Sequence, residues 1–594
     1  MQKEIKSRIK IYGVVAVLLA TVLGALCYNL GVIHEFGSVS PPLYSSLLKR
    51  FSSDEELRNF LMRNSERQGI IPFFGPVDAN LLLSIIPISK EDVESAPSLN
   101  VHSTTNIQVA GVDEADIVKT DGEFIYLISG SSVLILKAYP TIEAEVLSNI
   151  TFSNTYPAGI FVDSYSDRLA VLGCRYIIEY MPYPWSYYPS VFIDIKTSIN
   201  IYDISNKTRP TFLNNFTISG SYFDSRMIGD YVYFVVSQPA YIIYDTIVLP
   251  KIYTDEGIKE IKATEIYYSD VSDDYYLYTT IVALNIRDAS EEPTFKTIMM
   301  GSTSSMYVSL NNIYITFPEL DGQTSIYRIH IENTTINPEA KGKVQGREIN
   351  QFSMDEYDGY FRIATTTWVN GIPQNNLYIL NMSLDIVGNL EDFAPLGEIM
   401  DSARFIGNRC YLSTSTPRKD PFFVIDVENV TEPRILGNLS IPGFTRYLHP
   451  YDEDYVIGVG IEGSNVKITL FNVTNVNAPI NMSEYKITEA AWSDTPVFRE
   501  HKAFLFDRAK NLLVIPILTS IDYRQNAYVF NITLDSGIVL KGNVTHQENG
   551  IYGDSRFWIS RALYIENVLY TLSQKKIRMN NLETLVLMNE IDLP

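Results

Sequence analysis

Cysteine is scarce in this chain: three occur among 594 residues, and one of them, Cys27, lies in an apolar N-terminal run. The other two, Cys174 and Cys410, are too few for a disulfide framework. They could form a single disulfide, but both stand in β-type runs, which predicts small, buried hydrophobic side chains instead. The stability of the fold therefore has to come from packing.

Histidine is also rare, with six residues widely scattered along the chain. A metal site with several histidine ligands is therefore difficult to assemble. The motifs His-Glu-x-x-His, Gly-x-Ser-x-Gly, Gly-x-x-x-x-Gly-Lys and Cys-x-x-Cys are missing from the sequence. No motif thus points to a metalloprotease, an α/β-hydrolase, a P-loop NTPase or a dithiol redox enzyme, and we expect no catalytic residues.

Basic residues are outnumbered by acidic ones, 47 to 69, for a net charge of −22. Four basic residues and one acid lie within residues 1–33, so the remainder carries a net charge of −25. Such an acidic surface repels the phosphates of nucleic acids. The composition therefore argues against a nucleic-acid partner.

The N-terminus carries the one long hydrophobic run, "IYGVVAVLLATVLGALCYNLGVI", at residues 11–33. As a helix it would span a bilayer core of roughly 30 Å. Because the basic residues precede it, we expect the N-terminus inside and the rest outside the cell. Residues 1–33 are predicted to be a transmembrane anchor of a single-pass cell-membrane protein; a cleaved signal peptide and secretion are the alternative.

N-glycosylation sequons support export, because all eleven lie beyond the apolar run. They are Asn149, Asn206, Asn215, Asn333, Asn381, Asn429, Asn438, Asn472, Asn481, Asn531 and Asn543. The sequence therefore predicts a glycoprotein with an extracellular C-terminal domain.

Residues 34–104 are expected to hold one short helix and a stalk. In "SSDEELRNFLMRNSE", Ser53 and Glu56 have the spacing of a capping box, and Leu57, Phe60 and Leu61 form one apolar face. Prolines and loop-type residues after this helix favour a loosely packed or extended stalk.

From about residue 113 onward, short β-type runs recur with a self-similar ending, as in "NIYDISNKTRP", "FVIDVENVTEP" and "TLFNVTNVNAP". Each is an alternating strand that ends in a polar anchor residue before a turn. The anchors are Asp203, Asn285, His330, Asn381, Asp426, Asn472, Asn531 and Asn580, with Lys137 as a poor first copy; where insertions are absent they recur every 45 to 51 residues.

This period is typical of a propeller blade of four antiparallel strands. A single blade cannot cover both its faces, so blades stack face to face, and closing the ring removes the two orphan faces. The sequence predicts an all-β fold over residues 105–594: a β-propeller of eight to nine blades, preceded by the transmembrane helix and the short helix and stalk.

Three stretches carry a family resemblance: "NIQVAGVDEADIVKTDGEFIYLIS", "DPFFVIDVENVTEPRILGNLSIPGFTRYLHPYDEDYVIGVG" and "REHKAFLFDRAKNLLVIPI". They resemble exported archaeal and bacterial proteins with a C-terminal β-propeller domain distantly related to WD40 repeats. The resemblance implies a secreted or surface-anchored propeller and brings no established activity or catalytic residues. The sequons and the tyrosine and isoleucine content look archaeal.

Acidic residues crowd the first of these stretches. Asp121-Gly122 is a hairpin signal between "ADIVKT" and "EFIYLIS", one of several acidic turns in this chain. For Asp113, Glu114 and Asp116 two interpretations stay open: a solvated blade edge near the channel mouth, or a metal site. Calcium would be the ion, since carboxylates are its ligands, although the spacing is not that of an EF-hand loop.

A polar group of four residues, His449, Asp452, Glu500 and His501, stands on what we interpret as adjacent blades. Because inner strands approach the same channel, these side chains could converge there on a metal or act as acid and base. The alternative is structural: buried histidines and aspartates in a blade need hydrogen-bond partners.

Two insertions depart from the shared pattern, at residues 175–191 and 238–278. The first is rich in rings that could stack on a sugar or a partner's apolar surface: Tyr180, Tyr183, Trp185, Tyr187 and Tyr188. Folding back over its own blade is the alternative. In the second, Asp270, Asp273 and Asp274 suit either a calcium site or a flexible charged loop.

Together these features predict a membrane-anchored extracellular propeller that acts as a protein- or glycan-binding or structural module at the cell surface. An extracellular hydrolase or metal-dependent enzyme at the channel mouth is the alternative from another class. A subunit of a surface lattice is the third. No cofactor is expected, calcium apart.

Overall fold

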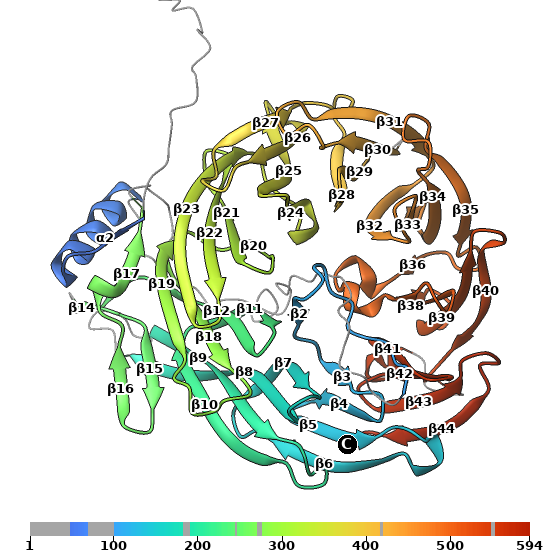
Figure 1. Ribbon diagram of the computed structural model, residues 1–594, viewed down its shortest axis with the longest axis horizontal. Coiled ribbons are helices and arrows are strands. Elements are labelled where there is room, and N and C mark those ends of the chain that lie inside the picture. The colour runs from blue at the N-terminus through green and yellow to red at the C-terminus, as the bar shows by residue number, and fades with distance from the viewer. Residues whose placement is uncertain are drawn as a thin grey trace, which may run out of the picture. The chain divides into compact units, whose positions relative to one another are not determined.

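The computed structural model describes residues 48–68, 100–181, 190–243, 246–269, 276–415, 420–547 and 553–594. Within them, nine sheets of four or more strands follow one another around a ring (Figure 1). The predicted all-β propeller is confirmed, and this number lies within the predicted eight to nine. In most sheets the four strands run in chain order from the channel to the outer wall.

Seven blades contain only their own four or five strands. The bounds of these strands are β3 (Val118–Thr120), β4 (Phe124–Ser129), β5 (Ser132–Lys137) and β6 (Glu145–Thr151); β20 (Ser305–Val308), β21 (Asn312–Pro318), β22 (Gln323–Glu332) and β23 (Thr335–Gln345); β24 (Met354–Tyr357), β25 (Tyr360–Val369), β26 (Ile372–Leu380) and β27 (Ile386–Leu390); β28 (Ile399–Ile406), β29 (Arg409–Ser415), β30 (Asp420–Asp426) and β31 (Arg434–Ile441); β32 (Phe444–Pro450), β33 (Tyr455–Glu462), β34 (Asn465–Asn472) and β35 (Ile480–Lys486); β36 (Ser493–Asp494), β37 (Leu505–Asp507), β38 (Leu512–Thr519), β39 (Arg524–Thr533) and β40 (Gly537–Val544); and β41 (Arg561–Ile565), β42 (Val568–Leu572), β43 (Lys576–Asn581) and β44 (Leu587–Asp592).

Two neighbouring blades are enlarged by further segments. The first has β7 (Tyr156–Asp163), β8 (Arg168–Met181), β9 (Ser190–Asp203) and β10 (Thr211–Ser219), extended by β15 (Lys251–Thr254) and β16 (Gly257–Glu260); the second has β2 (Asp113–Glu114), β11 (Ser221–Ile228), β12 (Tyr231–Pro239), β18 (Leu277–Asn285) and β19 (Thr294–Met300), extended by β17 (Ile266–Tyr268) and β1 (Lys49–Arg50). The insertion at 238–278 thus widens two blades, and it also forms the small hairpin of β13 (Ile242–Ile243) and β14 (Thr246–Ile247).

Hydrophobic clusters fill the space between neighbouring blades. One cluster, for example, joins Val118 and Leu134 of the β3–β6 blade to Leu563 and Tyr570 of the β41–β44 blade. Because these are the first and last blades in the chain, this cluster closes the ring. Figure 1 shows the light blue strands β3–β6 beside the red strands β41–β44 at this joint.

The repeat's anchor residues lie where the sequence predicts, within two residues of the end of the third strand of a blade. In five blades the side chain of the anchor accepts the backbone N–H two residues on and so starts the turn that follows. The Asn285 Oδ1 accepts the backbone N–H of Arg287 at 2.9 Å, and the Asn472 Oδ1 accepts that of Thr474 at 2.9 Å. An aspartate or asparagine recurs here because its side chain can bond the backbone two residues on.

Glycines on three fourth strands allow neighbouring blades to approach closely. A Cβ atom on Gly388 would lie 2.1 Å from the Val430 carbonyl oxygen of the next blade, and one on Gly437 would lie 2.4 Å from that of Val476. Gly342 approaches Leu384 in the same way, at 2.5 Å. The sequence signal is a recurring Gly-Asn or Gly-Lys pair on these strands.

The predicted short helix is α2 (Asp54–Gln68), and it packs against the outer edge of the β18–β19 sheet. Leu57, Phe60 and Leu61 are buried, as the pattern predicts. Phe51 stacks on Tyr268 with ring centroids 3.9 Å apart, so the helix is fixed to the propeller. The capping box is shifted by one residue: the Ser53 Oγ accepts the Glu56 N–H, but the Glu56 carboxylate accepts the Ser52 N–H.

The ring has two faces, which the turns distinguish. One face carries the turns between the first and second strands and between the third and fourth strands of each blade. We call it the mouth face. We call the other, where the second-to-third turns lie and the chain passes to the next blade, the crossover face. Antiparallel pairing within each blade places these turns at opposite ends of the strands.

Both cysteines of the described residues are free and buried, Cys174 in β8 and Cys410 in β29. Burial raises the pKa of the Cys410 thiol to about 12. This confirms the interpretation of both as small core side chains.

Several predictions concern residues outside the described part of the chain. These are the anchor at 1–33, the stalk over 69–99, the rings of Tyr183, Trp185, Tyr187 and Tyr188, and the acids Asp270, Asp273 and Asp274. The side chain of Tyr180 also lies outside. Among the helices that the structure describes, none has the length and hydrophobicity needed to cross a bilayer.

Candidate functional site

A segment that precedes the first blade, residues 100–117, crosses the central channel (Figure 1). It begins on the last blade, where the Ser103 N–H donates to the Tyr564 carbonyl at 3.0 Å. It then reaches the far side, where the Gln108 amide donates to the Gln351 and Met354 carbonyls. It ends as β2, paired with β11. We call it the plug, because it joins blades on opposite sides of the ring.

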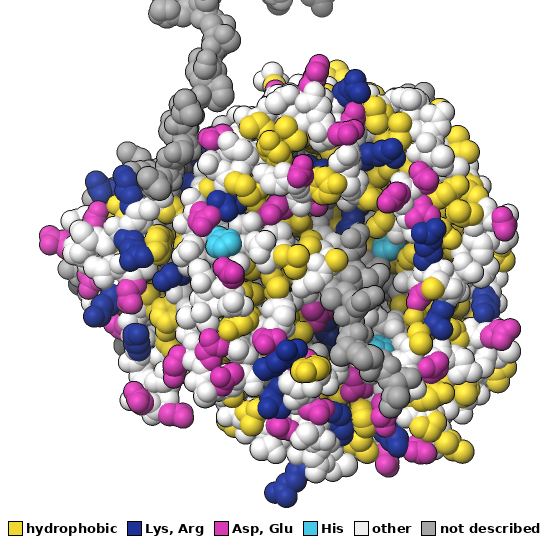
Figure 2. Space-filling view, viewed as in Figure 1, with side chains coloured by type: hydrophobic (Ala, Val, Ile, Leu, Met, Phe, Trp, Pro, Cys, Tyr) yellow, Lys and Arg dark blue, Asp and Glu magenta, His cyan; other side chains and the backbone are white. Residues whose placement is uncertain are grey.

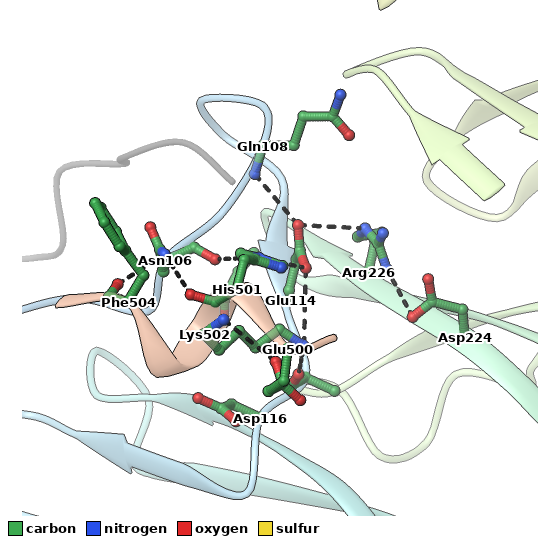
Figure 3. Close-up of polar contacts among 12 residues, drawn as sticks. Asn106, Gln108, Glu114, Asp116, Asp224, Arg226, Glu500, His501, Lys502 and Phe504 are labelled. Carbon is green, nitrogen blue, oxygen red and sulfur yellow. Dashed lines mark hydrogen bonds and ion pairs between the residues drawn. The ribbon is translucent and has the colours of Figure 1, made fainter. Parts of the chain in front are cut away.

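Glu114 is the buried charge at the centre of the plug, with 1% of its surface exposed. Its carboxylate lies 3.9 Å from the Arg226 Nε and 3.8 Å from the Lys502 Nζ, on blades separated by the channel (Figure 3). It also accepts the backbone N–H of Gln108 at 3.2 Å. Burial opposes ionisation of the Arg226 guanidinium, but Asp224 and Glu114 together outweigh it and raise its pKa, so it stays charged.

The two flanking aspartates are also ion-paired. Asp113 lies 2.7 Å from the Lys119 Nζ, and Asp116 lies 3.0 Å from the Arg561 guanidinium. The interpretation as a solvated blade edge is wrong for Glu114 and Asp116, which are buried, whereas Asp113 is half-buried. In the part of the chain that the structure describes, no group of three His, Cys, Asp or Glu side chains is placed to hold a metal ion. The carboxylates of this stretch instead pair with Lys119, Arg226, Lys502 and Arg561.

Asp121, the acid ahead of the first glycine, makes a turn as predicted. Its Oδ1 accepts the Phe124 N–H at 2.8 Å, and its Oδ2 accepts the Tyr126 hydroxyl at 2.7 Å. Gly122 has a φ of +91°, which favours glycine. The hairpin between β3 and β4 is therefore confirmed.

A cavity of about 960 Å³ opens beside the plug. Its wall includes the first-to-second turns of several blades, with Tyr165, Gly229, Tyr451 and Arg508 among them, so it lies at the mouth face. A preformed hollow of this size is in the range of small-molecule sites. It is the candidate functional site of the molecule.

The four predicted channel residues lie on adjacent blades, but they do not converge. The His449 Nδ1 is 3.2 Å from the Tyr447 hydroxyl, and the ring packs 4.7 Å from that of Phe504. Asp452 pairs with Arg508 at 2.8 Å, and Glu500 with Arg561 at 2.8 Å. Each carboxylate thus neutralises a different arginine.

His501 fixes the plug to the β36–β40 blade. Its Nε2 donates to the Asn106 carbonyl at 2.9 Å, and the Asn106 side-chain amide donates back to the His501 carbonyl at 2.8 Å (Figure 3). Both residues are buried. This reciprocal pair supports the structural alternative for His501.

The cavity wall combines paired charges with aromatic rings. Arg287 pairs with Asp163 at 2.5 Å and lies over the Tyr165 ring at 5.1 Å. Burial opposes ionisation of Asp163, but the hydrogen bonds from Arg287 and Ser166 outweigh it and lower the pKa of this carboxyl. Arg508 likewise lies over the Tyr451 ring, at 5.2 Å. Cations, acids and rings thus alternate around the mouth without an excess of one sign.

The eleven sequons lie on the surface, and none is buried. Six are at third-strand ends or third-to-fourth turns, on the mouth face: Asn206, Asn333, Asn381, Asn429, Asn472 and Asn531. Five are on fourth strands, at the outer wall: Asn149, Asn215, Asn438, Asn481 and Asn543. None of the eleven stands in a loop of the crossover face.

Sequence reasoning missed the cations of this site: Lys119, Arg226, Arg287, Lys502, Arg508 and Arg561. They stand singly in strands and turns, in no motif. The one available signal was physical: three acids in a four-residue stretch that enters a channel require cationic partners if they are buried.

A family model for the β-propeller domain matches residues 102–585. The chain belongs to this β-propeller family. Two archaeal relatives of this propeller are similar over most of their length, both described as uncharacterized proteins. One, from Archaeoglobus fulgidus, is 26% identical and covers 89% of this chain and 92% of its own. The other, from Methanocaldococcus jannaschii, is 28% identical and covers 83% of each.

Among solved structures, this propeller is similar to Sqt1 from Chaetomium thermophilum, with 8% identity, a TM-score of 0.34, and 61% of this chain and 82% of that one covered. It is also similar to the dihydro-heme d1 dehydrogenase NirN, with 12% identity, a TM-score of 0.34, and 70% and 72% covered.

Proposed function

We propose that this protein is a membrane-anchored, glycosylated cell-surface module that binds a glycan in the cavity at the mouth of its propeller. The observation that carries the proposal is the cavity itself: about 960 Å³, walled by turns of several blades and backed by the plug. Because a rigid ring holds these turns, the site needs little ordering on binding.

The chemistry of the wall favours a neutral, polyhydroxylated ligand. The Arg287, Arg508 and Arg561 side chains are neutralised by acids of the protein, so a charged ligand would have to break an existing pair. Hydroxyl groups can instead donate to carboxylates and accept from guanidinium groups without displacing either. Tyr165, 76% exposed, offers a ring for stacking against a sugar.

The mouth face is charged but mixed in sign (Figure 2). Acidic and basic side chains are interspersed over it rather than gathered into one patch. This supports a ligand recognised by hydrogen bonds and stacking rather than by net charge. The sequons on the mouth face and outer wall support exposure of these surfaces outside the cell.

Glycan binding is tested by titrating neutral oligosaccharides into the detergent-solubilised full chain by calorimetry. We expect Tyr165→Ala and Arg508→Ala to weaken binding about tenfold or more. Arg434→Ala, which removes an exposed arginine of the outer wall, is the control and should leave affinity unchanged. Binding that survives both cavity substitutions, or binding of a protein partner but of no glycan, would contradict the proposal.

The proposed glycosylation and the proposed membrane anchoring are tested by separate measurements. Mass spectrometry of native peptides should find glycans at Asn206, Asn333 and Asn429, which are exposed on the mouth face. Alkaline carbonate should leave the protein in the membrane pellet. Unmodified asparagines or release into the supernatant would contradict the respective part of the proposal.

A further inference from the structure

An exposed apolar cluster lies on the crossover face, in turns of two neighbouring blades and in the passages that follow these blades. We call Leu320, Ile349, Trp368, Val369 and Leu396 the loop-tip cluster. Leu320 is 79% exposed, Leu396 74% and Trp368 59%. Large apolar side chains gathered at loop tips, rather than scattered singly, mark an interaction surface.

Hydrogen bonds connect the loops that carry this cluster. The Gly346 N–H donates to the Gly322 carbonyl at 2.9 Å, which ties the turn after Leu320 to the loop of Ile349. Arg347 pairs with Thr366, two residues before Trp368. The Asn375 amide donates to the Glu398 carbonyl at 2.8 Å, which fixes the loop of Leu396 to the same blade.

The chain enters the propeller from this same face. In the sheet, Lys49 of β1 lies opposite Tyr268 of β17, and Tyr268 lies opposite Met299 of β19. Met299 is next to the end of β19, where the chain passes to the next blade. That passage leads to Ser304, whose hydroxyl donates to Glu348 at 2.6 Å, beside Ile349. The entry point and the cluster thus belong to neighbouring blades.

The length of chain before the entry point is short. Fourteen residues, 34–47, separate the apolar run at 11–33 from Leu48. Even fully extended they reach about 50 Å, at roughly 3.3–3.6 Å per residue. A bilayer that holds the apolar run therefore lies within reach of the crossover face, and the sequons avoid the loops of that face.

From this arrangement we propose that the loop-tip cluster inserts into the lipid interface of the membrane that anchors the chain. The inference rests on the proposed membrane anchoring. Tryptophan and branched apolar side chains are suited to the boundary between headgroups and acyl chains. The exposed charges beside the cluster, Asp321, Arg347 and Asp392, are not mainly basic, so apolar area and not attraction to anionic lipid holds it there.

The test uses the full chain reconstituted in neutral phosphatidylcholine vesicles. The emission of the wild type minus that of Trp368→Phe isolates this ring. We expect bromines placed high in the acyl chains to quench this difference emission, because interfacial side chains reach roughly 5–10 Å into the bilayer. Trp492→Phe is the control within the same face: Trp492 packs against Tyr523 on the crossover face of another blade, outside the loop-tip cluster. If the cluster alone inserts, the Trp492 difference emission should be quenched less than that of Trp368. Equal Trp368 emission with and without bromine would overturn the proposal.

A second measurement separates this inference from the anchoring on which it rests. A chain that resists carbonate extraction but whose Trp368 is not quenched is anchored without docking, which overturns the inference alone. If carbonate extracts the chain, the anchoring fails, and docking is then tested by flotation of the full chain with neutral vesicles. Flotation that is lost in Leu320→Ser/Leu396→Ser, with the melting temperature kept, would still support docking; a wild type that does not float would overturn it.

Discussion

His546 is a buried histidine that its surroundings in the propeller keep neutral. Its Nδ1 lies 2.9 Å from the Ser573 hydroxyl and its Nε2 lies 2.9 Å from that of Thr571. Burial, aided by Arg578 and Lys576, lowers the pKa of its imidazole from 6.5 to about 3. An unfolded chain would take up a proton here near pH 6.5, whereas the folded chain would not.

This pKa predicts a loss of stability in acid. The contribution of neutral, buried His546 to the free energy of unfolding is fully present above pH 6.5. It is lost progressively as the pH falls from 6.5 towards 3, by about 2 kcal/mol between pH 6.5 and 5. His546→Gln keeps hydrogen-bonding groups but cannot be protonated, so its stability should depend less on pH. Denaturant unfolding at pH 7.5 and 5.0 measures the stability of the wild type and of the variant. An equal pH dependence in the two proteins would show that His546 is not the group responsible.

Glu114 gives a second prediction at this scale. Glu114→Gln leaves Arg226 and Lys502 buried with one negative charge fewer, and breaking a buried pair in this way costs about 3–5 kcal/mol. Glu143→Gln is the matched control, because Glu143 pairs with Lys137 at an exposed site, where a pair contributes about 1 kcal/mol or less. Similar losses of unfolding free energy in the two variants would show that Glu114 does not tie the channel walls together.

The sequence identifies the acids of the plug but not their partners. Asp116 and Arg561 are 445 residues apart, and no spacing rule connects them. From the sequence alone, a metal site therefore stays one interpretation of these clustered carboxylates. The same limit holds for His449 and His501: the sequence places them on adjacent blades, but only the coordinates show that they bond different partners.

At the scale of elements, the regular features of the blades follow from the sequence. Alternating runs and anchors such as Asp203 and Asn472 place the third strands, because the turn that follows needs a side-chain acceptor. The destination of the insertion at 238–278 does not follow from its sequence, since edge strands such as β15 pair by availability of an open edge rather than by a local signal.

The close approach of blades at Gly388 gives a prediction for Gly388→Ala. The added methyl would lie 2.1 Å from the Val430 carbonyl oxygen, so the blades must separate or the strand must shift. Overpacking of this kind costs about 1–3 kcal/mol. Asn389→Ala, at the neighbouring exposed position, is the control and should change stability by about 0.5 kcal/mol or less. The melting temperatures of the two variants provide the comparison; a fall of equal size in both would contradict this role of the glycine.

For the whole molecule, closure depends on contacts between the two ends of the propeller. The backbone N–H of Ser103 in the plug donates to the last blade, and the backbone N–H of Glu566 in the last blade donates to the plug. The Asn589 side-chain amide donates to the Thr141 carbonyl at 2.6 Å. If these contacts open only when the ring opens, their amides should exchange hydrogen as slowly as those of β42.

Hydrogen exchange followed by mass spectrometry measures this directly. Peptides that cover residues 100–104 and 561–572 should be protected to the same extent. The exposed turn at Asp522 is the internal reference and should exchange fast. Rapid exchange over 100–104 alone would mean that the plug detaches while the ring stays closed.

The course of the plug also sets the order in which this protein can be made. Ser103 leaves the ribosome early, yet its partner Tyr564 is synthesised 461 residues later. Contacts of such long range slow folding, because the intervening chain must be confined before they form. The early segment therefore waits for the last blade, and the ring cannot be closed before the whole propeller has been synthesised.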